Sequence, residues 1–221
     1  MSQTQFEQCS ICNELNKKII DNLYFLQMKE IYEECNVKSR ILYEDEHFYV
    51  IPTLGPISEC HLLIIPKVHV CSFALLSDKQ LIKADELIKK VRNVVNKVYG
   101  CSIVFEHGTL NEKMQSSASC NHAHMHVVSC DKSIIPFLKK DGLQLRRVER
   151  INEIKEQKKR GVPYFYYCEN ALDSFIMDDI IQKSQYMRIL VANILKTPKK
   201  GNWKTNFGSS EIVAMIIKMK K

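Results

Sequence analysis

Apolar residues recur at intervals of three and four along the stretch that follows Asp78, and this spacing predicts one long amphipathic helix. Asp78 is the expected N-cap, and Gly100 is the expected end of the helix. Similar spacing predicts a second amphipathic helix over residues 13–35. Two more helices are expected near the end of the sequence, at Ser184–Leu195 and Ser209–Met219. The apolar positions of the long helix are Leu81, Ala84, Leu87, Ile88, Val91, Val94, Val95 and Val98.

Short apolar or alternating runs predict strands on both sides of the long helix. The run Leu62–Pro66 is partly β-branched and is bounded by His61 and Pro66, as is typical of a buried strand. A charge-rich stretch, Lys139–Gly161, is the expected exposed linker. The other predicted strands are Arg40–Glu44, Phe48–Thr53, Ser102–Glu106, His122–Ser129 and the aromatic Tyr164–Tyr167.

Composition narrows the class of protein. Hydrophobic residues make up 45% of the 221 residues, enough for one domain or one domain with a modest appendage. The net charge of +7 favours anionic ligands such as nucleotides and would also suit nucleic acid, although dispersed lysines are typical of a solvated surface. No apolar run has the length of a signal peptide or a membrane span, so a cytoplasmic protein is expected. Its nine cysteines would then stay reduced, and paired cysteines are better interpreted as metal ligands than as disulfides.

Three alternating histidines stand in the segment HAHMHVV, at His122, His124 and His126. On a strand, this period of two places the three imidazoles on one face and the small or apolar residues on the other. Such an array can bind a metal, carry protons or attack an electrophile. Three unrelated surface histidines are the alternative, and the apolar residues between them argue against it.

A pair of cysteines, Cys9 and Cys12, has the spacing at which two thiolates converge on one tetrahedral zinc ion. A redox dithiol is the competing interpretation, but the surrounding sequence lacks the β-α-β pattern of a thioredoxin-like site. Incidental cysteines are a third reading. With a single such pair, the remaining zinc ligands must come from elsewhere, and histidines are the obvious donors.

Two weaker motifs lie between these features. His61 to His69, HLLIIPKVH, is a strand that ends at Pro66 and is followed by a basic residue and a histidine. Phe105 to Gly108 ends another strand with a polar pair, and its glycine would allow the backbone to approach a ligand closely. Each motif taken alone fits a plain strand-to-loop turn equally well.

Together these segments resemble the histidine triad (HIT) superfamily. HAHMHVV matches that superfamily's HxHxHxx signature, and CHLLIIPKVH resembles its GHxLxxPKxH stretch with Cys60 in place of the usual glycine. YEDEHFYVIPTLGP resembles the strand pair of its nucleoside pocket, and VFEHG takes the place of another of its strands. The resemblance covers residues 41–130. In the tail, YFYYCE, SQYMRILVANIL and GNWK are similar, less specifically, to the C-terminal extension of larger HIT-like proteins.

The resemblance implies an α+β fold, in which a long helix packs on an antiparallel sheet, plus a C-terminal α/β extension. Residues 1–140 would form the HIT-like catalytic domain with an N-terminal CxxC arm, and residues 141–221 would form the extension packed on it. It also implies a hydrolase or nucleotidyl transferase that acts at the α-phosphorus of a nucleoside phosphate derivative through a nucleotidyl-histidine intermediate.

The same resemblance assigns roles to residues. His124 would be the nucleophile, His126 would bind phosphate oxygens or the leaving group, and Ser119 would supply a phosphate-binding hydroxyl. The acidic ribose contact of the family falls at Thr53, and Glu106 is the expected replacement. The nucleoside-binding residues are then Ile51, Thr53, Leu54, Glu106 and His126. A structural zinc would be held by Cys9, Cys12, His69 and His122, with His107 as the reserve ligand.

Two further departures from the family pattern bear on these roles. Ala118 stands where a phosphate-binding glutamine is usual, and a long helical insert separates Cys12 from the first strand. Two other functions stay open: a nucleotide-sensing or RNA-associated binding module without turnover, and a zinc-structured interaction protein in which all three triad histidines are ligands. A nucleotide is the expected partner, with no membrane, and the resemblance allows a homodimer.

Overall fold

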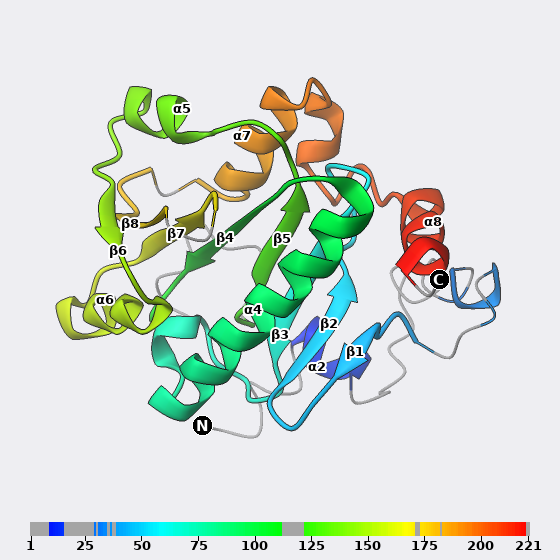
Figure 1. Cartoon of the computed structure of the whole chain (residues 1–221), viewed down its shortest axis with the longest axis horizontal. Helices are drawn as coiled ribbons and strands as arrows, with labels where there is room; N and C mark the ends of the chain where they lie inside the picture. Colours follow the sequence, from blue (N-terminus) through cyan, green and yellow to red (C-terminus); the bar gives the residue numbers. More distant parts are fainter. Residues whose placement is uncertain are drawn as a thin grey trace.

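The computed structural model describes residues 9–15, 29, 31–34, 36, 39–111, 122–170, 173–181 and 183–219. Its centre is an eight-stranded sheet in which all paired neighbours are antiparallel (Figure 1). In spatial order the strands are β1 (Tyr43–Glu44), β2 (Phe48–Pro52), β3 (His61–Pro66), β5 (Met125–Ser129), β4 (Ser102–Gly108), β7 (Tyr164–Cys168), β8 (Ser174–Asp178) and β6 (Arg146–Val148).

The long helix α4 (Asp78–Tyr99) lies across one face of this sheet (Figure 1). Its apolar stripe packs on strand residues that point to the same side, such as Val104 and Val127. Ser77, one residue before the expected cap, is the true N-cap: its hydroxyl and the Gln80 side chain form a reciprocal capping box. The helix ends at Gly100, whose φ of 92° suits glycine.

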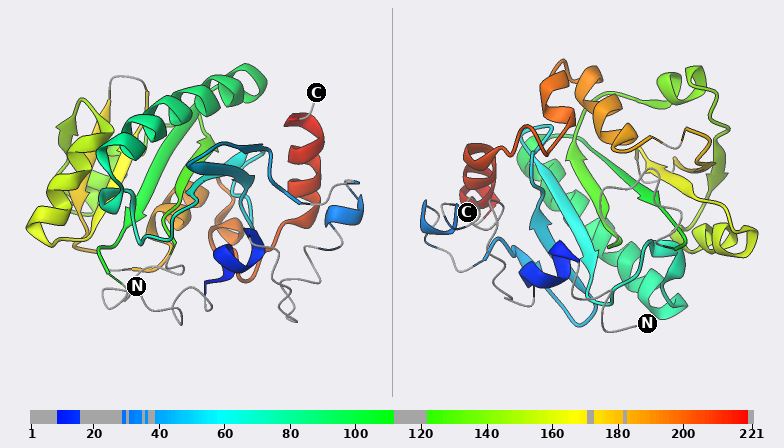
Figure 2. Two further views of the ribbon diagram at one scale, coloured as in Figure 1. Left: turned by 90° about the horizontal axis from the view of Figure 1, so that it is seen from below. Right: turned by 180° about the vertical axis from the view of Figure 1, so that it is seen from behind.

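The opposite face of the sheet carries the N-terminal α2 (Ser10–Leu15) and α7 (Tyr186–Ile194), as Figure 2 shows. Apolar residues of α7 form a second core with strand residues such as Phe105 and Val128. Other helices in the described residues are α5 (Ile135–Lys140), α6 (Lys155–Arg160) and α8 (Ser209–Met219), and 3₁₀ turns include η1 (Phe73–Leu75), η3 (Ile151–Ile154) and η4 (Pro198–Gly201). Within the part of the chain that is described, no helix has the length and apolar composition that crossing a membrane requires.

The expected α+β architecture, an antiparallel sheet under one long helix, is confirmed. The stretch Lys139–Gly161 is not a simple linker, because it contains β6, η3 and α6 and buries Ile151 and Ile154. Most side chains in this stretch are charged and point outward, so the sequence pattern did not reveal the few residues that point inward. The strand expected over His122–Ser129 begins only at Met125. The helix expected over residues 13–35 lies largely outside the described residues.

The sheet also relates the two parts of the sequence. β7 pairs with β4, so that the strands after residue 141 continue the same sheet. α8 in turn contacts β2, near the other edge. The division into a catalytic part and an extension at residue 140 stays a prediction. What the fold establishes is that the segment after residue 141 lies close enough to contribute side chains to a site on β5.

Candidate functional site

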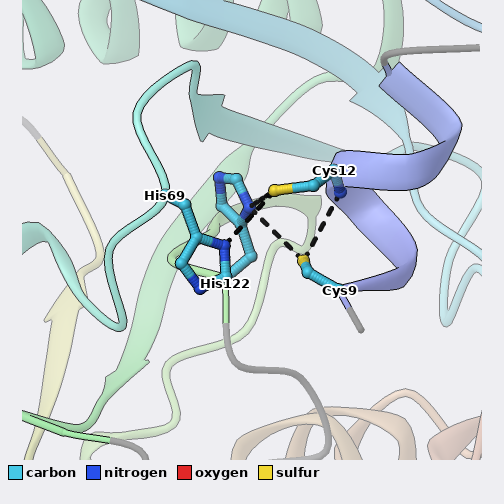
Figure 3. A group of neighbouring side chains, drawn as sticks. All are labelled: Cys9, Cys12, His69 and His122. Atoms are coloured by element: carbon cyan, nitrogen blue, oxygen red, sulfur yellow. Dashed lines mark hydrogen bonds between the residues drawn. The ribbon is translucent and has the colours of Figure 1, made fainter. Parts of the chain in front are cut away.

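Four side chains from three distant segments converge beside β5 (Figure 3). Cys9 and Cys12 come from the start of α2, His69 follows β3, and His122 precedes β5. Their ligand atoms all lie within 4.8 Å of one another, and all four residues are buried. The Cys12 sulfur lies 3.2 Å from Nδ1 of His122 and 3.3 Å from Nδ1 of His69, and the Cys9 sulfur lies 3.6 Å from Nδ1 of His122.

These separations suit a tetrahedral zinc ion. Bonds of roughly 2.0–2.3 Å from two nitrogens and two sulfurs imply ligand-to-ligand distances of roughly 3.3–3.8 Å. Nε2 of His122 lies 2.8 Å from the carbonyl oxygen of Pro66, and this bond turns Nδ1 of the ring toward the sulfurs. The backbone N–H of Cys12 donates to the Cys9 sulfur at 3.4 Å, as is common for a thiolate that binds a metal. The donor set and its spacing therefore fit zinc.

Apolar packing holds the two cysteines in place. α2 forms a small core with β2 and β3, in which Ile11 lies with Ile51 and Leu63. Ile51 is fully buried in this core and is absent from the lining of the pocket described below, so that it supports the pocket wall from behind. The N-terminal arm therefore reaches the triad, although the insert between Cys12 and the first strand is long.

His124 lies next to this cluster but presents its ring differently. Its Nδ1 lies 2.7 Å from the carbonyl oxygen of His122. A carbonyl can only accept, so Nδ1 carries the proton and the lone pair of Nε2 is left to face the pocket. Burial, with the positive groups nearby, lowers the pKa of His124 to about 4. The ring is therefore neutral at physiological pH, the form in which an imidazole attacks an electrophile.

His126 is held in the opposite tautomer by a chain of hydrogen bonds. The backbone N–H of Ile57 donates to Nδ1 of His61 at 3.4 Å, which leaves the ring proton of His61 on Nε2. That Nε2 lies 2.8 Å from Nδ1 of His126, which must accept and so carries its own proton on Nε2. The His126 ring also stacks on Phe105, with centroids 4.5 Å apart. His126 is thereby fixed as a hydrogen-bond donor.

A pocket of about 200 Å³ lies against His124 and His126. Ser10 and Ile11 of α2 line it, together with Leu63 of β3 and the expected nucleoside-binding residues Thr53 and Leu54. Arg40 also lines it, and a carboxylate neutralises this arginine: Nε and Nη2 donate to the two oxygens of Glu14 at 2.6 and 2.8 Å. The rest of the wall comes from the far end of the sequence, as Arg188, Trp203 and Lys204.

The structure does not bring Glu106 to this pocket. The strand alternates, so that Phe105 faces His126 and Glu106 points to the α4 side. There its carboxylate accepts from the backbone N–H of Phe73 at 2.8 Å and from the hydroxyl of Tyr164 at 2.5 Å, and burial raises its pKa to about 7. Gly108 makes room for the ring of Tyr164 rather than for a ligand, because an added Cβ would lie 2.3 Å from that ring.

Two other residues expected at the site, His107 and Ser119, lie elsewhere or outside the described residues. His107 is not part of the cysteine cluster: its Nε2 lies 2.7 Å from a carboxylate oxygen of Asp179. His69 occupies the fourth position instead. Ser119 lies outside the described residues, so its role stays a prediction.

Comparison with known proteins places the chain in a family. The model for the family described as "Scavenger mRNA decapping enzyme C-term binding" matches residues 27–140, just over half of the chain. The chain belongs to this family.

Two relatives of this chain are named as histidine triad (HIT)-like proteins. An uncharacterized HIT-like protein of Methanocaldococcus jannaschii is 27% identical over 124 residues, which cover 54% of this chain and 91% of the relative. An uncharacterized 16.1 kDa HIT-like protein of Mycoplasma pneumoniae is 30% identical over 99 residues, which cover 43% of this chain and 65% of the relative. The membership of the histidine triad superfamily that the sequence indicated is thus confirmed.

Solved structures of proteins named as HIT family members also match the chain. A HIT family hydrolase from Clostridium thermocellum is 19% identical, with a TM-score of 0.38, over 57% of this chain and 95% of the other.

His61 and Arg188 are among the residues of this histidine triad site that sequence reasoning missed. His61 stood in a quoted motif, but only as the residue before a strand, and its contact with His126 depends on the pairing of β3 with β5. Arg188 lies in a predicted helix of the tail, and no local pattern marks it. Its one signal is a cation within the otherwise apolar run MRILVA. An arginine in such a run is expected to be buried and to bind a partner there.

Proposed function

We propose that this protein is a hydrolase or nucleotidyl transferase that attacks the α-phosphorus of a nucleoside phosphate derivative through His124. The observation that carries the proposal is the pair of complementary tautomers in one pocket. His124 presents a lone pair and His126 presents an N–H, and a different bond to the protein fixes each ring. A nucleophile beside a hydrogen-bond donor is the minimum that displacement at phosphorus requires.

In the first step, the Nε2 lone pair of His124 forms a bond to the α-phosphorus, and the bond from phosphorus to the leaving oxygen breaks. The leaving group departs with that electron pair. The positive charge that develops on the His124 ring is stabilised by the carbonyl of His122, which accepts from Nδ1–H. The Nε2–H of His126 donates to an oxygen on which negative charge accumulates.

In the second step, the oxygen of water attacks the phosphorus and the P–N bond breaks, so that the electron pair returns to Nε2 of His124. The proton of the water passes to solvent, and a nucleoside monophosphate is released. A phosphate or sugar phosphate in place of water would make the same chain a transferase.

The name of the matched family supports one group of substrates. The matched family is named for scavenger mRNA decapping enzymes, and an mRNA cap is a nucleoside joined to a second nucleotide through a phosphate chain. The wall of the pocket supports a nucleoside as well, since Leu54, Leu63 and Trp203 offer apolar surface on which a base could pack.

The test is a substrate panel of dinucleoside polyphosphates, capped dinucleotides and nucleoside phosphoramidates. We expect turnover of at least one of them, and intact-mass spectrometry of a rapidly alkali-quenched reaction, in which a P–N bond to histidine survives, should show a nucleotidyl adduct on wild type but not on His124→Asn. Absence of both turnover and adduct across the panel would contradict the proposal. It would favour a binding module, for which calorimetry with the same compounds is the direct measurement.

We further propose that Cys9, Cys12, His69 and His122 hold zinc. When bound, the ion would cross-link the N-terminal arm to the segment before β5. Support comes from the four buried donor atoms and their spacing. Two thiolates and two imidazoles complete a tetrahedral shell, so the site would have no open position for water and its role would be structural.

A further inference from the structure

The C-terminal segment completes the pocket wall. Arg188 belongs to α7, and Lys204 follows η4, yet both line the same pocket as His124 and His126. α7 lies on the same face of the sheet as α2, which supplies the opposite part of the lining (Figure 2). The segment after residue 141 therefore bears directly on which ligands the pocket accepts.

Arg188 is held in one orientation by uncharged acceptors. Its side chain is buried, at 6% exposed. Nη1 donates to the hydroxyl of Thr53 at 3.5 Å, Nε donates to the carbonyl of Gly201 at 3.4 Å, and Nη2 donates to the carbonyl of Gly55. A guanidinium has five N–H donors, so that two of them are left for a ligand after these three bonds.

The charge of Arg188 has no acidic partner within the described part of the chain. Arg40 on the same pocket differs, since Glu14 neutralises it. Burial alone lowers the pKa of Arg188 to about 10, so the group is still charged at neutral pH. A buried cation without a counter-charge costs free energy, and an anionic ligand in the adjoining pocket would offset that cost.

The number of cations indicates what kind of anion binds. The phosphorus under attack in a phosphoramidate or an anhydride carries one negative charge, whereas a polyphosphate chain carries several. Lys204 is exposed at the pocket and adds a second cation to that of Arg188. A planar guanidinium that offers two N–H groups also matches the geometry of phosphate oxygens.

We propose that Arg188, assisted by Lys204, binds the phosphate groups beyond the α-phosphorus, so that the chain selects nucleoside polyphosphates over nucleoside phosphoramidates. The orientation of the substrate in this inference rests on the proposed function, since His124 defines which phosphorus is attacked. Arg188 is then a specificity-determining residue that the C-terminal segment contributes.

The first experiment measures binding and needs no turnover. Isothermal calorimetry with inorganic tripolyphosphate is run on the full chain as wild type, Arg188→Met, Arg188→Lys and Lys204→Met. The matched control is Lys199→Met, an exposed lysine of η4 that does not line the pocket. Affinity should fall about 10- to 100-fold for Arg188→Met and about 2- to 5-fold for Lys204→Met. The control should bind as wild type does.

The second experiment compares kcat/KM for a dinucleoside polyphosphate with that for a nucleoside phosphoramidate of the same base. The ratio should fall about 10- to 100-fold in Arg188→Met, partly recover in Arg188→Lys, and stay constant in Lys199→Met. Equal losses on both substrates, or tripolyphosphate binding unchanged in Lys204→Met and the Arg188 variants, would overturn the inference. If Arg188→Met fails to fold, Lys204→Met decides. If wild type turns over neither substrate, the proposed function fails and the binding experiment still decides this inference.

Discussion

His122 and His124 stand two residues apart, and the contrast between their surroundings separates the cysteine cluster from the pocket. Each ring is hydrogen-bonded to a backbone carbonyl oxygen, but through a different ring nitrogen. Pro66 holds Nε2 of His122, so Nδ1 faces the cysteines, whereas the His122 carbonyl holds Nδ1 of His124, so Nε2 faces the pocket. The chemistry of an imidazole here depends on which nitrogen the backbone holds, and spacing along the sequence does not reveal that.

The cysteine cluster and the pocket also differ in whether they have room for a ligand. All four residues of the cluster are buried, and their donor atoms face one another, which leaves no room for a substrate. The pocket instead has a half-buried imidazole, that of His124, and a wall that carries a buried cation. A closed donor set is typical of a structural site, and an open set with unused hydrogen-bonding capacity is typical of a binding site.

The largest expected effect comes from removing the proposed nucleophile, His124. His124→Asn should lower kcat by about 10⁴-fold, the scale for removing a nucleophile from a concerted unit, while the melting temperature changes little. His122→Asn should instead lose both metal and stability, although it lies only two residues away. Steady-state kinetics and thermal melts of the two variants separate these outcomes. More than a tenth of wild-type activity in His124→Asn would refute the assignment.

The next effect concerns the cluster alone. Cys12→Ser should lose the one zinc expected per chain and destabilise the fold by several kcal/mol, or about 10 °C in melting temperature. The matched control is Cys101→Ser, because Cys101 is an exposed cysteine outside the cluster. Elemental analysis of protein purified without chelator, followed by calorimetry, provides the measurement. Wild type without zinc, or Cys12→Ser with zinc retained, would show the metal assignment to be wrong.

The buried carboxyl of Glu106 belongs to neither the cluster nor the pocket, and it should affect the pH dependence of stability instead. Burial raises the pKa of Glu106 from 4.5 to about 7, so its contribution to stability is fully present below pH 4.5 and is lost as the pH rises through 7. Glu106→Gln removes this dependence. Relative to wild type, the variant should gain about 3 kcal/mol between those pH values. Urea denaturation across the range tests this, and a constant difference would contradict it.

The smallest effect tests the tautomer of His126. His61→Leu removes the donor to Nδ1 of His126, which should lower kcat about 10- to 100-fold, as is usual when an orienting partner is lost. His61→Gln, which keeps an N–H donor, should restore part of the rate. ¹⁵N NMR of the His126 ring offers a readout independent of activity: the proton should be on Nε2 in wild type and be shared between both nitrogens in His61→Leu. An unchanged ring spectrum would contradict the hydrogen-bond chain from His61 to His126.

Periodic features were predictable from the sequence, and pairings were not. The apolar stripe of α4 and the run of β3 are local patterns, and the structure confirms both elements. The cysteine pair and His69 could be connected to His122 only through a resemblance to known proteins. Glu106 shows the limit: which face of β4 meets His126 depends on the register between strands, and that is a long-range property.

The C-terminal half was harder for the same reason. The edge strand β6 is three residues long and lies in a charge-rich stretch, where side-chain exposure hides the alternation. Arg188 acquires its role from contacts with Thr53 and Gly55, which lie far away in sequence. Its place on the pocket therefore became visible only in three dimensions. Ser119 and a homodimer stay predictions.

The pocket is assembled from Ser10 near one end of the sequence and Lys204 near the other. Contacts between such distant residues require large loops to close, so they form late and slowly compared with local hairpins such as β2–β3. Secondary structure can therefore be regained during refolding before any binding capacity returns. In a refolding time course, circular dichroism would recover first, and tripolyphosphate binding would report the moment at which the two ends of the chain have met.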